Sequence, residues 1–120
     1  MSRRYLTKTE ADSALRRGKT IEVFVGGCEV QNKKCIRWAS FNLSGSLVIG
    51  SLWEALDQGT EDYLDIYTFD SPTGDYNEAV ITVEAENVEL AAKELGLNEL
   101  NFVNQGVVQD EYLSYLKSST

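Results

Sequence analysis

The chain has 120 residues, of which 42% are hydrophobic and 25% are charged, values typical of a single soluble globular domain. It contains no histidine, which excludes the Ser-His-Asp and Cys-His catalytic arrangements, imidazole metal ligands and the usual proton shuttle at neutral pH. Its formal net charge of −8 makes nucleic acid an unfavourable partner, because phosphate groups repel an acidic protein.

The N-terminal segment MSRRYLTKTEADSALRR carries basic residues with no apolar stretch after them, so we expect no secretory signal. We expect residues 1–4 to form a flexible basic tail. No apolar run in the chain approaches the roughly 20 residues that span a bilayer. We therefore predict a cytoplasmic protein without a membrane partner.

The first predicted helix lies in LTKTEADSALRRG, residues 6–18. Thr7 and Glu10 have the spacing of a capping box, and Gly18 can end the helix in the left-handed conformation. The apolar stripe of this helix is narrow and consists of Ala11, Ala14 and Leu15. We expect the helix to lie on a sheet and to bury little surface.

Two strands are predicted next, in TIEVFVGG at residues 20–27 and KCIRWASFNL at residues 34–43. Gly26 and Gly27 indicate a bend or bulge in the first strand. In the second strand, alternation places two pairs on opposite faces: Ile36 with Trp38, and Ala39 with Phe41.

The turn between these strands leaves two registers open. A two-residue loop at Gln31–Asn32 sets Cys28 opposite Cys35 and makes a disulfide geometrically possible, whereas a loop one residue later sets Cys28 opposite Arg37. Because a chain without an export signal usually keeps its thiols reduced, we expect both cysteines to be free. Two thiols also fall short of the four ligands of a structural zinc site.

Residues 47–49, LVI, are a candidate short third strand. The segment SLWEALDQG, residues 51–59, then has a second capping-box pattern in Ser51 and Glu54, and it ends at a glycine. The pattern predicts a helix of about two turns.

A hairpin is predicted from DYLDIYTF, residues 62–69, a turn in DSPTGD, and a second strand in EAVITVEA, residues 78–85. Alternation turns Leu64 and Ile66 towards the core. The other face of residues 62–69 is aromatic and acidic. With a nearby tryptophan it forms the candidate partner-binding patch: Trp53, Tyr63, Asp65, Tyr67 and Phe69. The alternative is that a helix covers this face, so that the strand is buried on both sides.

Side chains with carboxylate or amide oxygens gather in and after that turn, at Asp70, Asp75, Asn77 and Glu78, but they lack the spacing of a calcium-binding loop. We therefore expect no metal site and no cofactor.

The C-terminal third contains two further helices. NVELAAKELG, residues 87–96, is capped by Asn87 and closed by Gly96. LNFVNQGVV is ambiguous between a strand and a loop. DEYLSYLK predicts a closing helix that is capped by Asp110 and buries Leu113 and Leu116, followed by a flexible end at residues 118–120.

These elements predict a single compact α+β domain over residues 1–120. It would contain an antiparallel sheet of four to five strands, with the helices packed mainly on one face.

Charge is divided unevenly along the chain. Residues 1–40 hold nine basic and four acidic residues, a net of +5, whereas residues 41–120 hold two basic and fifteen acidic residues, a net of −13. Either the basic N-terminal region folds over the acidic region and neutralises it, or an acidic face is kept for a basic partner.

The leading functional hypothesis is a non-catalytic interaction module, such as an inhibitor or immunity-like protein, that presents an acidic, aromatic face to a basic protein. The first alternative is a small-molecule-binding domain or minor enzyme with a pocket lined by Trp38, Trp53 and tyrosines. The second is a structural subunit of a homodimer.

Overall fold

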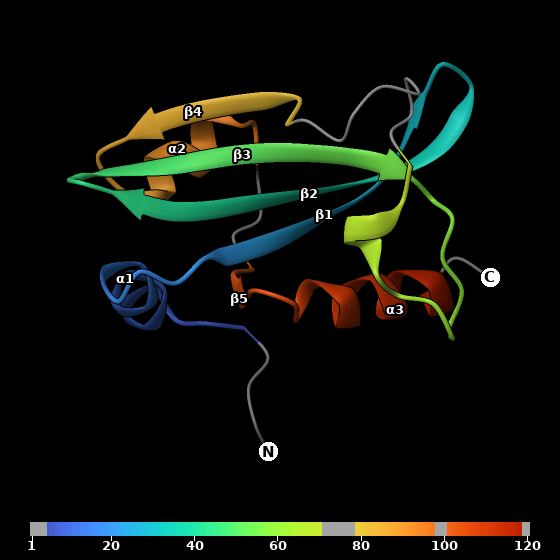
Figure 1. Ribbon diagram of the computed structural model, residues 1–120, viewed down its shortest axis with the longest axis horizontal. Coiled ribbons are helices and arrows are strands. Elements are labelled where there is room, and N and C mark those ends of the chain that lie inside the picture. Colours follow the sequence, from blue (N-terminus) through green and yellow to red (C-terminus); the bar gives the residue numbers. More distant parts are fainter. Residues whose placement is uncertain (1–4, 71–78, 98–100, 119–120) are drawn as a thin grey trace.

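One antiparallel sheet organises the described part of the chain, which in this computed structural model comprises residues 5–70, 79–97 and 101–118. The strand order is β4-β3-β2-β1-β5 (Figure 1). The elements in chain order are α1 (Lys8–Arg16), β1 (Ile21–Val30), β2 (Lys33–Ser44), β3 (Leu47–Leu56), the 3-10 turn η1 (Ile66–Thr68), β4 (Ile81–Ala85), α2 (Val88–Glu94), β5 (Val103–Asn104) and α3 (Val108–Ser118). The α+β class and the antiparallel sheet are confirmed.

Local signals set the ends of the first two helices as predicted. At α1 the Thr7 N–H donates to Glu10 Oε1 (2.9 Å) and the Glu10 N–H donates to Thr7 Oγ1 (3.1 Å), a complete capping box. At α2 the side chain of Asn87 accepts from the backbone N–H of Leu90 (2.9 Å). Gly18 follows α1 with a φ of +79°, a conformation in which a Cβ would be strained.

The hairpin of β1 and β2 adopts the first of the two registers considered above. Gln31 and Asn32 both have positive φ, as a two-residue turn between twisted strands requires, and Cys28 faces Cys35 directly. Both thiols are unbridged in the structure. The register shifts between Phe24 and Gly26, which confirms the bulge predicted from the glycine pair.

The predicted helix over residues 51–59 is wrong. Residues 51–56 of this segment belong to β3, which pairs with β2 along its whole length, from Leu47 opposite Ser44 to Leu56 opposite Cys35. A capping box satisfies only the backbone donors of one helical turn, whereas pairing with β2, joined by β4 at Ser51 and Leu52, satisfies a longer stretch of backbone. The tertiary pairing therefore overrides the local pattern.

The predicted strand over residues 62–69 is also wrong, and so is its hairpin. The segment turns through η1, and β4 pairs with β3 instead. The Leu56 N–H donates to the Asp70 carbonyl (2.8 Å), so the chain leaves the sheet and returns to its end. Most of the predicted turn at residues 70–75 lies outside the described residues.

The final helix, α3, starts at Val108, two residues before the predicted cap, and Asp110 lies in its first turn. It buries Val108 and Tyr112, whereas the predicted core residues Leu113 and Leu116 are half-buried. The ambiguous segment before it contributes only the two-residue strand β5.

The sheet carries a separate core on each face. Alternation turns Val23, Ala39 and Phe41 to one face, where they pack with α1 and α2. Ile36, Trp38 and Ala55 turn to the opposite face, where they pack with α3 and η1. Two of the three described α-helices thus share one face.

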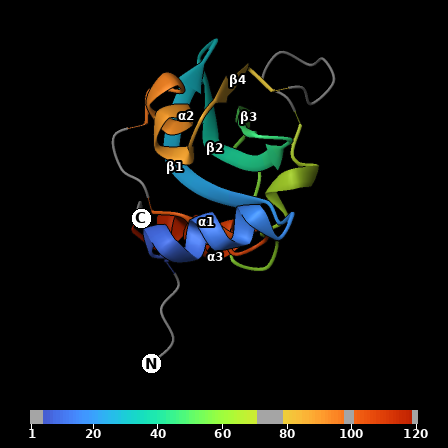
Figure 2. The same cartoon turned by 90° about the vertical axis from the view of Figure 1, so that its left-hand side faces the viewer.

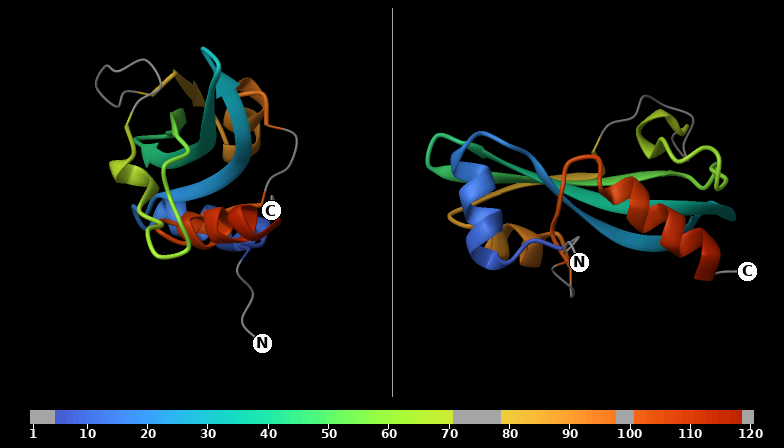
Figure 3. Two further views of the ribbon diagram at one scale, coloured as in Figure 1. Left: turned by 90° about the vertical axis from the view of Figure 1, so that its right-hand side faces the viewer. Right: turned by 90° about the horizontal axis from the view of Figure 1, so that it is seen from below.

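The strands twist strongly along their length (Figure 2), and α1 and α3 lie near opposite ends of them (Figure 3). Because α3 and η1 cover only one end of their face, the neighbouring part of that face is left for the pocket described next.

Candidate functional site

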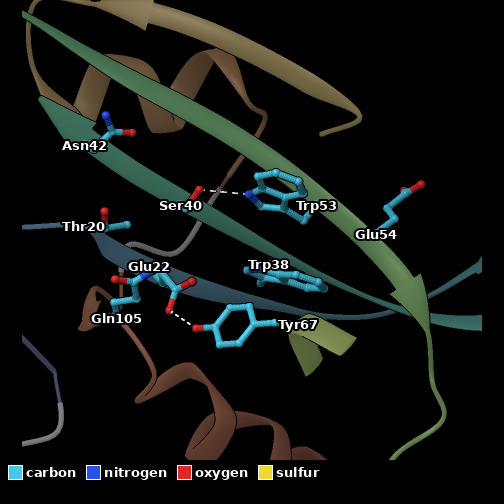
Figure 4. Close-up of a pocket in the computed structure, with 9 residues that line it drawn as sticks. All are labelled: Thr20, Glu22, Trp38, Ser40, Asn42, Trp53, Glu54, Tyr67 and Gln105. Carbon is cyan, nitrogen blue, oxygen red and sulfur yellow. Dashed lines mark hydrogen bonds between the residues drawn. The ribbon is translucent and has the colours of Figure 1, made fainter. Parts of the chain in front are cut away.

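A pocket of about 380 Å³ lies on the second face of the sheet, beside η1. We call it the aromatic pocket and define it by Glu22 from β1, Trp38 and Ser40 from β2, Trp53 from β3, Tyr67 from η1, and Gln105, which follows β5 (Figure 4). The adjacent strands β1, β2 and β3 therefore form the floor of the pocket. Tyr67 and Gln105, which are distant from these strands in sequence, form its side.

Strand register explains why these side chains meet. Glu22 lies opposite Ser40, and Trp38 lies opposite both Phe24 and Trp53, so all of them project from one face. The indole rings of Trp38 and Trp53 are nearly parallel, with an interplanar angle of 15° and centroids 6.4 Å apart. The Trp53 Nε1–H donates to Ser40 Oγ (2.9 Å), which fixes the orientation of that ring.

Glu22 is the charged residue at the base of the pocket, and only 2% of it is exposed. Its Oε1 accepts a hydrogen bond from the Tyr67 hydroxyl (2.5 Å) and another from the Gly106 N–H (3.0 Å). Gly106 has a φ of +94°, a conformation that glycine adopts without the strain a side chain would bring.

Burial raises the pKa of the Glu22 carboxyl, and the hydrogen bonds from Tyr67 and Gly106 only partly oppose this effect. The pKa of the Tyr67 hydroxyl is also raised, first by burial and then by the neighbouring Glu22 carboxylate. The two groups therefore form a hydrogen-bonded pair in which the tyrosine remains the donor.

Ion pairs between described residues join Lys8 to Glu89 (Nζ to Oε1, 3.6 Å) and Arg37 to Glu54, and neither includes Glu22. Each pair links a base from residues 1–40 to an acid from residues 41–120, so internal neutralisation accounts for part of the uneven charge. Glu54 also lies at the pocket edge, with its carboxylate bound to Arg37.

The structure places the predicted partner-binding residues in different surroundings. Trp53 and Tyr67 line the aromatic pocket, and 38% of Tyr67 is exposed. Phe69 is completely buried beneath the Tyr63 ring, and Tyr63 itself is exposed. Asp65 is half-buried and accepts from Gln109 Nε2 (3.4 Å). The four residues predicted to share a strand face are therefore not one patch.

The sequence patterns did not identify Glu22 as a candidate site residue. Alternation already separates it from Ile21 and Val23, so its place on the second face could have been read from the strand pattern. Its burial could not, because Tyr67 and Gly106 reach it from positions 45 and 84 residues further along the chain.

No group of three or more Cys, Asp or Glu side chains suited to a metal ion occurs within residues 5–70, 79–97 and 101–118. Of the acidic set around the turn, Asp70 is exposed, and the others lie outside these ranges. None of the helices in the same ranges is both long enough and apolar enough to cross a membrane.

Comparisons of the chain with known protein families, curated proteins and solved structures find no match.

The chemical character of the aromatic pocket comes from two indole rings, one phenol and one buried carboxylate. Aromatic faces and a carboxylate both attract cations.

Proposed function

We propose that this protein is a non-catalytic interaction module that receives a basic side chain of a partner protein in the aromatic pocket. The observation that supports the proposal most is the Glu22 carboxylate, which is buried and has no basic partner among the described residues. Taking a carboxylate out of water is costly, and a cation placed beside it recovers part of that cost. The surrounding indole rings would add cation–π attraction.

The overall charge supports the same kind of partner. Residues 41–120 carry a net charge of −13, of which the ion pairs of Lys8 and Arg37 neutralise only a small part. A field of this sign speeds the approach of a basic protein, and added salt screens it.

The test is retention of partners from an extract of the native host by the immobilised protein and two matched variants. Glu22→Gln removes the pocket carboxylate, and Glu84→Gln removes one exposed carboxylate from β4. A basic protein should be retained by the wild type and by Glu84→Gln, lost by Glu22→Gln, and released as salt rises. Equal retention by all three proteins, or retention that does not respond to salt, would contradict the proposal.

A second candidate is a small-molecule-binding domain, because a pocket of about 380 Å³ lies within the usual size range of ligand sites. Trp38 and Trp53 line it, and their flat apolar rings support this second candidate. Native mass spectrometry of the protein purified from its host would then show a bound small molecule that is absent from a Trp53→Ala variant.

A further inference from the structure

We infer that the cation received by the aromatic pocket is a guanidinium, so that the anchor of the partner is an arginine and not a lysine. For the partner, this inference rests on the function proposed above. For the pocket, it rests on ring geometry and on the distribution of hydrogen-bond acceptors, which small probes can test without any partner.

The walls of the pocket favour a flat cation. Trp38 and Trp53 are within 15° of parallel, and the Tyr67 ring stands at 80° to Trp38 with their centroids 6.1 Å apart. Figure 4 shows Trp38 between Trp53 and Tyr67, with Glu22 beside the hydroxyl of Tyr67. A planar guanidinium can stack on an indole face and still point its N–H groups past the ring edge, which a compact ammonium cannot do.

The acceptors around the pocket are several and are spread out. Glu22 Oε1 already accepts two hydrogen bonds, and both bonds of the carboxylate to described residues end on Oε1, which leaves Oε2 for a ligand. Ser40 Oγ accepts from Trp53 and has a second lone pair, and Asn42 brings an amide to the rim. A guanidinium has five N–H donors in a fixed plane, whereas an ammonium has three donors at one point.

The difference in hydration between the two cations also favours a guanidinium over an ammonium. A cation must lose much of its water to sit between the indoles and Glu22, and a guanidinium is less strongly hydrated than an ammonium. A neutral planar ligand would fit the walls but would leave the buried carboxylate without a counter-charge.

The experiment uses ethylguanidinium chloride, ethylammonium chloride and neutral ethylurea as probes at constant ionic strength. The chain has only two tryptophans, and both line the pocket, so intrinsic tryptophan fluorescence reports directly on this site. Ethylguanidinium should give a saturable change with an affinity about tenfold or more above that of either other probe, since a stacked or charge-assisted contact accounts for roughly that ratio.

Two variants test whether ethylguanidinium binds beside Glu22 in the aromatic pocket. Glu22→Gln should weaken ethylguanidinium binding by about tenfold or more, because it removes the counter-charge. Glu84→Gln should leave binding unchanged, as it removes an exposed carboxylate that does not line the pocket. If Glu22→Gln does not fold, as judged by circular dichroism, the ranking of the three probes on the wild type decides the matter alone.

Equal affinity for ethylguanidinium and ethylammonium, tighter binding of ethylurea, or no saturable change would overturn the inference. These results are separable from failure of the proposed function. If ethylguanidinium binds as expected but no partner depends on Glu22, the proposed function fails and the ligand class stands. If a Glu22-dependent partner is found whose anchor binds equally well as lysine, the ligand class fails and the function stands.

Discussion

The charge state of Glu22 depends on its burial and on hydrogen-bond donors that are distant from it in the sequence. It occupies an inward position of β1, where burial penalises the charged carboxylate, and two donors from distant segments stabilise that charge. Tyr67 is the more important of these donors, because its hydrogen bond lowers the pKa of Glu22 more than that of Gly106 does and because its side chain also lines the pocket. Changes in the protonation of Glu22 should therefore affect both stability and binding.

The pH dependence of stability should show the raised pKa of Glu22. Because this pKa is higher in the folded than in the unfolded protein, Glu22 contributes stability below its unfolded pKa, and this contribution is lost as pH rises through the folded pKa. Glu22→Gln has no proton to lose. The free energy of unfolding of the wild type, minus that of the variant, should therefore fall as pH rises.

Urea melts of both proteins between about pH 4 and about pH 8 measure this difference, and the other carboxyl groups cancel in the subtraction. A difference that stays constant or rises over this range would show that the pKa of Glu22 is not raised by folding.

At the scale of the elements, the segment from Asp57 to Asp70 is held against α3 by close packing. The Gly59 N–H donates to the Tyr112 hydroxyl (2.9 Å), and that hydroxyl donates to Asp57. A Cβ at Gly59 would stand 2.4 Å from Cε2 of Tyr112 and 2.7 Å from Cζ of Phe69, and both of these rings are fully buried. The segment that carries Tyr67 to the pocket is thus positioned by steric fit at a glycine.

Gly59→Ala should lower the free energy of unfolding by about 1–3 kcal/mol, the usual cost of forcing extra volume into a packed core. Denaturant melts measure it, with Glu61→Ala at an exposed position two residues away as the control, expected to change stability by about 0.5 kcal/mol or less. A Gly59→Ala protein as stable as the control would mean that the segment is loosely packed on α3.

At the scale of the whole molecule, two cores share one sheet. Strand β2 places Phe41 in the core under α1 and α2, and it places Trp38 in the core under α3. Neither core can lose its strands while the other keeps them, so the domain should unfold in one cooperative transition. The internal ion pairs join the basic and acidic parts of the chain across the same unit.

Leu15→Ala in the first core and Ile66→Ala in the second should each lower the free energy of unfolding by about 2–5 kcal/mol. For each variant, the unfolding transition measured by far-ultraviolet circular dichroism should shift by the same amount as the transition measured by tryptophan fluorescence. Leu15→Ala is the sharper test, since both tryptophans lie on the other face of the sheet. Transitions that separate between the two probes would show that the cores unfold independently.

The sequence by itself determined the features that depend on neighbours within about four residues. The capping box of Thr7 and Glu10, the cap at Asn87 and the bulge near Gly26 form as predicted, because their hydrogen bonds and dihedral preferences are local. Strand alternation by itself likewise places Trp38 on the opposite face from Ala39 and Phe41.

Only the tertiary structure decided the features that need a distant partner. Residues 51–56 have a helical capping pattern, yet they form a strand because β2 pairs with all of them and β4 pairs with Ser51 and Leu52. Residues 62–69 alternate like a strand, yet they turn through η1, and Ile66 and Phe69 pack in the core with Tyr112 of α3. The pocket arises in the same way: Glu22 becomes buried and Tyr67 reaches it because chain segments 45 residues apart are brought together by packing, and no local pattern encodes that contact.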